Sequence, residues 1–271
     1  MAHAGAARRQ LRAQVGELLY GRNAVLEALR AGRRRVDYLA VARGAEARGT
    51  LAAILEEARR RQVAVRMVER QDLDRLAPGH QGVALQASGY PYEELEALIA
   101  RASPRALFLL LDCLEDPQNV GTLLRTAEVV QVAGVVIPAH RAVGITPAVS
   151  NASAGAVEHL AVAMVGNLVQ AMEALREAGV WLIGVEDRPI AQVYDQVDWR
   201  GPVALLVGSE GRGMRRLVQE SCDLLVRLPM AGRIGSLNVA VAGSIVLYHA
   251  WRQRTREAAP EGGDGSFARN L

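Results

Sequence analysis

The chain has 271 residues and contains no lysine, so all 32 of its basic residues are arginine. Only two cysteines occur, Cys113 and Cys222, and neither has a metal-binding spacing around it. We interpret both as reduced core residues of a cytoplasmic protein. No apolar run is long enough to cross a membrane, and the start of the chain lacks the apolar segment of a secretory signal. The sequence therefore argues against a disulfide scaffold and against a membrane protein.

Common motifs of hydrolases and metalloenzymes are absent as well. The sequence has no G-x-S-x-G, no H-E-x-x-H and no C-x-x-C pattern. None of its five histidines has a partner at a spacing typical of a catalytic or metal-binding pair. We therefore expect no metal site. The histidines are His3, His80, His140, His159 and His249.

Hydrophobic residues make up 50% of the chain, which is typical of a globular protein with one or two domains. The net charge is only +3, but arginines cluster toward the N-terminus. Guanidinium groups bind phosphates in a bidentate manner, so such clusters suit a nucleic-acid backbone. The alternative is that these arginines lie on solvated helix faces and in a tail. The clustered residues are Arg8, Arg9, Arg12, Arg22, Arg30, Arg33, Arg34, Arg35, Arg59, Arg60 and Arg61.

Turn residues and hydrophobic patterning divide the chain into two α/β units. We predict a basic tail over 1–15, a small α/β domain over 16–88, a linker over 89–104, a second domain over 105–256 and a tail over 257–271. In the small domain, we expect a turn over 18–23, helices over 24–30, 46–61 and 71–76, and strands over 36–41, 63–68 and 82–87.

Strands and helices alternate in the second domain after a helix over 93–102 in the linker. Continuous apolar strands of this kind belong in a parallel sheet that is covered on both faces. A last helix begins near Asn238 and is apolar on nearly every face, so we expect it to be buried. The strands are predicted over 106–111, 132–137, 160–165, 180–185, 203–207 and 224–228, and other helices over 168–178 and 214–220.

The first stretch that could carry chemistry follows the strand over 106–111. We place a helix N-cap at Asn119, after which one helical face is apolar and the opposite face carries Gly121 and Arg125. A glycine near a helix start costs about 1 kcal/mol relative to alanine, so it indicates close approach of a ligand or another segment. The alternative is a solvent-facing Arg125 paired with Glu128.

Two further stretches end strands with glycine-rich or polar loops. The run Gly208-Ser-Glu210-Gly211-Arg-Gly213 differs from the dinucleotide fingerprint, yet a glycine-rich turn at this place is the usual ligand crevice of an open α/β sheet. The run from Leu228 to Asn238 ends with polar groups at the start of an apolar helix, an arrangement that suits a ligand site. The alternative interpretations are a tight turn and an ordinary helix cap.

These three stretches together carry a family resemblance. N-x-G-x-x-x-R after a strand, then G-x-E-G-x-G-M, then L-P-M-x-G-x-x-x-S-L-N-V-x-V-A, in this order, resemble the SpoU (TrmH) class of RNA ribose 2′-O-methyltransferases over about residues 105–255. The motifs Y-G-R-N-A-V over 20–25 and H-Q-G-V over 80–83 resemble the small substrate-binding domain of family members that methylate a guanosine in bacterial 23S rRNA. The loop at Gly235-Ser236 departs from the pattern, since a second serine is common there.

The resemblance implies a SPOUT-type fold, in which a C-terminal parallel-sheet domain contains a trefoil knot and a small N-terminal α/β domain binds RNA. It implies S-adenosyl-L-methionine as cofactor, RNA as partner, no DNA and a homodimer with the site near the interface. The implied cofactor-binding residues are Gly208, Gly211, Leu228, Met230 and Leu237. The implied catalytic residues are Asn119, Arg125, Glu210, Ser236 and Asn238.

The activity implied by the resemblance is methyl transfer to a ribose 2′-hydroxyl, with a guanosine in 23S rRNA as the first candidate. The alternatives are a tRNA or another rRNA nucleoside, an RNA-binding protein without catalysis, and a nucleotide-binding enzyme for small molecules. The role of Arg125 also stays open. A guanidinium pKa above ~12 makes it a poor base, so it either accepts the proton in an unusual setting or contacts the 2′-oxygen or an adjacent phosphate.

Overall fold

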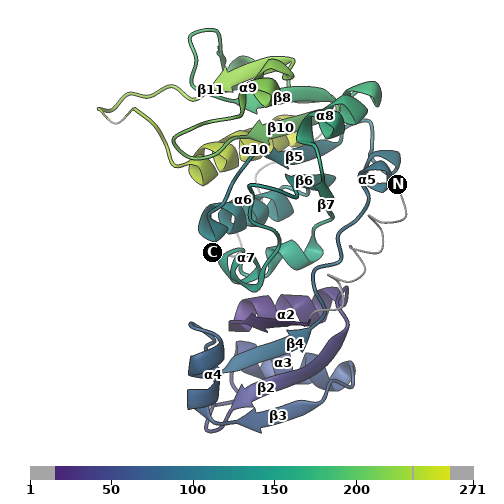
Figure 1. The fold of residues 1–271 in the computed structure, drawn as a ribbon, viewed down its shortest axis with the longest axis vertical. Helices are drawn as coiled ribbons and strands as arrows, with labels where there is room; N and C mark the ends of the chain where they lie inside the picture. The colour runs from purple at the N-terminus through teal and green to yellow at the C-terminus, as the bar shows by residue number, and fades with distance from the viewer. Residues whose placement is uncertain (1–15, 234, 257–271) are drawn as a thin grey trace.

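The computed structural model describes residues 16–233 and 235–256, so the predicted tails over 1–15 and 257–271 lie outside the described residues. Figure 1 shows a small unit built on one sheet below a larger unit built on another. No helix in the described part of the chain is long and apolar enough to span a membrane.

The small unit contains a four-stranded mixed sheet in the order β1-β4-β2-β3. The β2 and β3 strands are parallel and are joined by α3, whereas β4 runs antiparallel to both β1 and β2. Its elements are β1 (Glu17–Tyr20), α2 (Arg22–Ala31), β2 (Val36–Ala42), α3 (Thr50–Arg60), β3 (Val65–Val68), α4 (Arg70–Leu76) and β4 (Val83–Ala87).

The predicted turn over 18–23 is wrong, because Glu17–Tyr20 forms β1 and α2 begins directly after Gly21. Leu19 is fully buried beside Leu39 and Leu85, in a core that α2 and α3 cover from one face of the sheet. A four-residue strand is too short to show a periodic pattern, and its partner β4 lies far along the chain. The other predicted elements of this unit are present, with α3 starting four residues later than expected.

The large unit contains a seven-stranded, fully parallel sheet in the order β7-β6-β5-β10-β8-β11-β9. Its strands are β5 (Leu107–Leu111), β6 (Gly134–Pro138), β7 (Val162–Val165), β8 (Trp181–Val185), β9 (Gln192–Val193), β10 (Val203–Val207) and β11 (Leu224–Arg227). Its helices are α5 (Leu95–Ala100), α6 (Pro117–Val129), α7 (Pro147–Ala152), α8 (Leu168–Glu177), α9 (Arg216–Glu220) and α10 (Val239–Arg256), with short 3-10 helices η1 (Ala156–His159) and η2 (Tyr194–Gln196).

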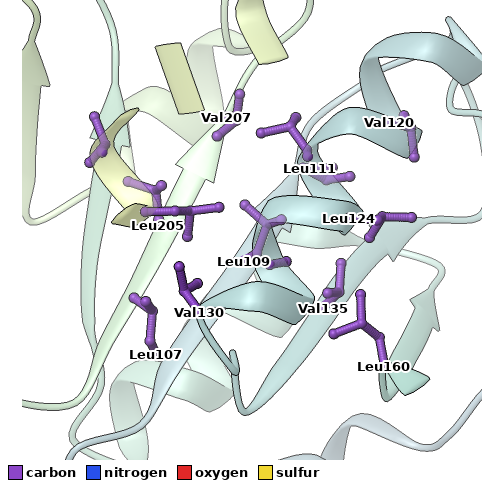
Figure 2. Packing of buried hydrophobic residues seen from close by; sticks show 14 of the residues in the cluster. Leu107, Leu109, Leu111, Val120, Leu124, Val130, Val135, Leu160, Leu205 and Val207 are labelled. Atoms are coloured by element: carbon purple, nitrogen blue, oxygen red, sulfur yellow. The ribbon is translucent and has the colours of Figure 1, made fainter. Parts of the chain in front are cut away.

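Side chains alternate along β5, an interior strand, and build a core on each face of the large sheet. Leu107, Leu109 and Leu111 pack with α6 and α10 on one face, as Figure 2 shows for α6 and the neighbouring β10. Phe108 and Leu110 pack with α5, α8 and α9 on the other face. The predicted parallel sheet with both faces covered is therefore confirmed, whereas α7 and β9 were not predicted.

Two predictions about the helices beside the sheet need correction. The α10 helix is not buried all round, because Val241, Ile245 and Tyr248 are exposed by 44%, 37% and 46%. These residues follow an i, i+4, i+7 spacing and form one exposed apolar stripe. Gly121 is not on an exposed face either, since it is buried against α7. Gly121 therefore allows another segment of the chain, α7, to approach α6 closely.

Both cysteines are free thiols. Burial raises the pKa of Cys222 to about 12, and its Sγ donates to the carbonyl oxygen of Val218 over 3.4 Å. Burial, with the neighbouring Asp112, also raises the pKa of Cys113. Thiols of this kind remain protonated near neutral pH and are poor nucleophiles.

Candidate active site

The three stretches singled out in the sequence meet at the carboxyl edge of the large sheet. The Asn119 Nδ2 donates to Glu210 Oε2 over 3.1 Å, and the Asn238 Nδ2 donates to Asn119 Oδ1 over 2.9 Å. These bonds join residues that lie 91 and 119 positions apart in the sequence. A continuous polar network thus links the start of α6, the turn after β10 and the start of α10.

Asn119 is not the N-cap of α6, contrary to the prediction. Asp116 caps the helix by accepting from the backbone N–H of Gln118 over 3.0 Å, and Pro117 occupies the first helical turn, where its missing N–H costs nothing. The side chain of Asn119 is consequently available for Glu210 and Asn238. The α6 helix fixes the position of Asn119 without using the side-chain amide of this residue as a cap.

Asn238 does cap α10, as the sequence suggested. Its Oδ1 accepts from the backbone N–H groups of Ala240 and Val241 over 2.9 and 3.3 Å. This pair of bonds fixes the orientation of the amide, so that its Nδ2 is directed to Asn119. The residue is therefore a helix cap and a member of the polar network at the same time.

A cavity of about 310 Å³ opens beside this network, between the loops that follow β8, β10 and β11. This volume is at the lower end of the range typical of small-molecule sites. All five residues predicted to bind a cofactor line it, together with Glu210 and Ser236. The lining residues that matter here are Glu186, Asp187, Gly208, Glu210, Gly211, Arg227, Leu228, Met230, Ser236 and Leu237.

The wall formed by the turn after β10 needs its glycines. Ser209 and Gly213 exchange two backbone hydrogen bonds of 3.0 and 2.9 Å, with Gly211 at a positive φ of 78° between them. A Cβ on Gly208 would lie 2.3 Å from the backbone nitrogen of Met214. The glycine thus lets the turn fold back on the end of β10.

Glu186 is a residue of this cavity that the sequence reasoning missed. It directly follows β8, and its Oε2 accepts from the backbone N–H of Met214 over 3.1 Å, which ties the turn after β10 to the neighbouring strand. The rule that ligands bind beyond the carboxyl ends of parallel strands would have pointed to it. Three carboxylates therefore line the cavity, those of Glu186, Asp187 and Glu210.

We expect Gly208→Ala to abolish measurable cofactor binding or to weaken it strongly. The added methyl group displaces the turn 209–213, which forms one wall of the cavity. Isothermal titration with S-adenosylhomocysteine measures the effect. Gly166→Ala is the matched control, because a Cβ at Gly166 meets no atom within 4 Å. Equal affinities of the two variants would contradict the prediction that this turn binds the cofactor.

Arg125 lies on the same helix as Asn119 but is exposed and does not line the cavity. Within the described part of the chain it forms no ion pair, so the alternative of an Arg125–Glu128 pair is not observed. Ser236 is exposed at the mouth of the cavity. The structure thus gathers Asn119, Glu210, Ser236 and Asn238 at one place and leaves Arg125 exposed outside the cavity.

Most of the clustered arginines already have carboxylate partners. Arg59 pairs with Glu56 over 2.7 Å, and Arg60 and Arg61 pair with Glu57 over 2.6 and 2.9 Å. By contrast, the loops after β6, β8, β10 and β11 each present an exposed arginine that has no ion pair among the described residues. These arginines are Arg141, Arg188, Arg212 and Arg233.

Comparison with known proteins identifies the family. Residues 106–248 match the SpoU rRNA methylase family, and residues 18–93 match a domain described as RNA 2′-O ribose methyltransferase substrate binding. A crystal structure of an RNA 2′-O ribose methyltransferase superposes with a TM-score of 0.75 at 27% sequence identity, covering 89% of this chain and 90% of that one.

The chain is similar to two curated relatives over nearly the whole length of each. The chain is 41% identical over 245 residues to YacO of Bacillus subtilis, a putative TrmH family tRNA/rRNA methyltransferase, covering 89% of this chain and 97% of the relative. It is 38% identical over 250 residues to the 23S rRNA (guanosine-2′-O-)-methyltransferase RlmB of Pseudomonas syringae pv. tomato, covering 90% and 98%. The chain therefore belongs to the SpoU family of RNA methyltransferases.

Proposed function

We propose that this protein methylates a ribose 2′-hydroxyl in RNA, and that the polar network of Glu210, Asn119 and Asn238 beside the cavity forms its reaction site. S-adenosyl-L-methionine supplies a methyl group on a sulfonium sulfur, and the products are the 2′-O-methyl ribose, S-adenosylhomocysteine and a proton. The network carries the proposal, because it brings three distant motifs to the edge of one cavity.

The cavity fits a cationic, nucleoside-containing cofactor. Its three carboxylates favour the positive charge of the sulfonium and amino groups, and the glycine-rich turn lets backbone groups approach a nucleoside closely. Gly208, Gly211, Leu228, Met230 and Leu237 would hold the cofactor. We infer that the trefoil knot expected of this fold lies in the same loops and holds them together.

We propose that the remaining residues act on the ribose. Asn119 and Asn238 each keep a second Nδ2–H that the network does not use, and we expect these hydrogens to donate to a ribose oxygen. Glu210 holds Asn119, and Ser236 contributes a hydroxyl at the cavity mouth. Arg125 contacts the 2′-oxygen or its adjacent phosphate. Binding in this geometry brings the 2′-oxygen in line with the methyl group.

A guanosine in 23S rRNA is the proposed substrate, supported by the full-length similarity to RlmB and by the substrate-binding domain. We place the reaction in the cytoplasm. The test is to incubate the protein with unmodified 23S rRNA and, separately, unmodified tRNA, and to map the methylated nucleotide by mass spectrometry of RNase fragments. Methylation of tRNA alone, or of a nucleoside other than guanosine, would contradict the proposed substrate.

We also propose a homodimer that covers the exposed stripe of Val241, Ile245 and Tyr248 on α10. The stripe lines a groove together with Thr122 and Thr126 of α6, the helix that carries Arg125. A second copy of the chain would bury both helices near the reaction site. We expect Ile245→Glu to convert a dimer into a monomer in light scattering. A monomeric wild-type protein would contradict the proposal.

The arginines of the carboxyl-edge loops are the expected phosphate contacts. We expect the double variant Arg141→Gln, Arg212→Gln to bind RNA more weakly. The slope of log K against log salt concentration should also become shallower, by about 0.7 to 0.9 for each phosphate that is no longer bound. Arg59→Gln with Arg60→Gln removes the same charge from residues that are already paired, and should change neither quantity. Filter binding over a range of salt concentrations measures both. Equal effects of the two double variants would show that overall charge, rather than phosphate contacts by the loop arginines, determines RNA affinity.

A further inference from the structure

A buried charged network joins the small unit to the large one. Arg34, from the turn between α2 and β2, has a side chain with 0% exposure. Its Nε and Nη2 donate to the two carboxylate oxygens of Glu158, in η1 of the large unit, over 2.8 and 2.9 Å. Its Nη1 donates to Glu17 and to the carbonyl oxygen of Ser88 over 2.8 and 3.0 Å. The guanidinium is thus held in one orientation by both units.

Glu158 is fixed from the large unit as well. Its side chain is 1% exposed, and its Oε1 accepts from Ser150 Oγ in α7 over 2.9 Å. A buried ion pair gains little net stability, because the desolvation of both charges offsets their attraction. The bidentate geometry of the Arg34–Glu158 pair nevertheless adds directional specificity to the contact between the two units. The network is therefore better explained by geometry than by stability.

The α7 helix connects this contact to the reaction site. On one side, Asn151 Nδ2 donates to the carbonyl oxygen of Tyr20 over 3.0 Å, and a Cβ on Gly21 would lie 2.2 Å from that nitrogen. On the other side, a Cβ on Gly121 in α6 would lie 2.5 Å from the Cβ of Ala152. One helical turn therefore touches both the small unit and the helix that carries Asn119 and Arg125, and Figure 1 shows α7 between α2 and α6.

We propose that Arg34, Glu158 and Asn151 are positioning residues that fix the distance between RNA held by the small unit and the ribose at Asn119. This proposal rests on the proposed function, and adds that the protein rather than the RNA selects the nucleotide. If the units moved independently, the RNA structure alone would decide which ribose reaches the cavity.

The test uses the full chain with Asn151→Ala, and a second variant in which Arg34→Met and Glu158→Leu remove both buried charges together. We expect kcat/KM on a long rRNA fragment to fall about ten- to hundred-fold, since a shift of about 1 Å in a bound substrate can cost that much. We also expect methylation to spread to neighbouring nucleotides. The affinity for S-adenosylhomocysteine should stay unchanged.

Asn167→Ala is the matched control, because Asn167 caps α8 through its Oδ1 and takes no part in the contact between the units. It should methylate the wild-type nucleotide at the wild-type rate. If both test variants methylate that same single nucleotide with unchanged kcat/KM, the positioning role is overturned. Failure of the proposed function is distinguishable, because the wild-type protein itself would then produce no 2′-O-methyl ribose.

Discussion

Arg125→Ala should lose most of the methyl-transfer activity while keeping its affinity for S-adenosylhomocysteine. Arg125 is exposed, lies outside the cavity lining and forms no ion pair within the described residues, so its removal disturbs neither the fold nor the cofactor site. Loss of one positioned charge-assisted contact in a reaction site costs about 10²- to 10³-fold in rate. Single-turnover methylation of RNA and calorimetry with S-adenosylhomocysteine measure the two properties separately.

Arg125→Lys distinguishes the two roles left open for this residue. If the guanidinium contacts a phosphate or the 2′-oxygen, lysine should recover part of the rate without its bidentate fork. If it accepts the proton, the lower intrinsic pKa of lysine should give a rate that climbs steeply with pH. Arg105→Ala is the control, an exposed arginine before the amino end of β5. A rate for Arg125→Ala within a few fold of wild type would remove Arg125 from the mechanism.

Glu158→Ala should destabilise the protein by about 3 to 5 kcal/mol, the usual cost of removing one partner of a buried ion pair. The variant leaves the Arg34 guanidinium, which has 0% side-chain exposure, with only Glu17 and a carbonyl oxygen as acceptors. The contact between the two units should weaken most, so the small unit should unfold first. Urea unfolding followed by circular dichroism measures the loss.

The control for this prediction is Glu56→Ala on the surface of α3. Glu56 also pairs with an arginine, Arg59, but both side chains are mostly exposed, at 63% and 78%. Exposed pairs contribute little, so the unfolding midpoint should not change. An unfolding curve of Glu158→Ala that coincides with that of Glu56→Ala would show that burial of the Arg34–Glu158 pair has no energetic consequence.

The architecture of the large unit was predictable because its signals are local. The run Leu107–Leu111 is apolar without interruption, which is typical of a buried parallel strand, and the buried face of α6 follows helical spacing. The N-cap of α6 could also have been placed at Asp116, since a proline follows it directly. By contrast, β1 depends on pairing with β4, a non-local contact that no short pattern reveals.

The site was predictable as three motifs but not as a geometry. The motif order placed Asn119, Glu210 and Asn238 beyond the ends of parallel strands, yet their mutual hydrogen bonds span up to 119 positions. The arginine clusters were harder to interpret. Arg34 looked like a member of a basic surface patch, but its partner Glu158 lies 124 residues away, and only folding shows that the pair is buried.

The position of the transferred methyl group tests the central claim most directly. The protein is incubated with unmodified RNA and S-adenosylmethionine labelled in its methyl group, and the RNA is digested to nucleosides for chromatography and mass spectrometry. We predict label in a 2′-O-methylated nucleoside for the wild-type protein and a strong reduction for Arg125→Ala. Label on a base, or cofactor binding without any transfer to RNA, would contradict the assignment of this site to ribose 2′-O-methylation.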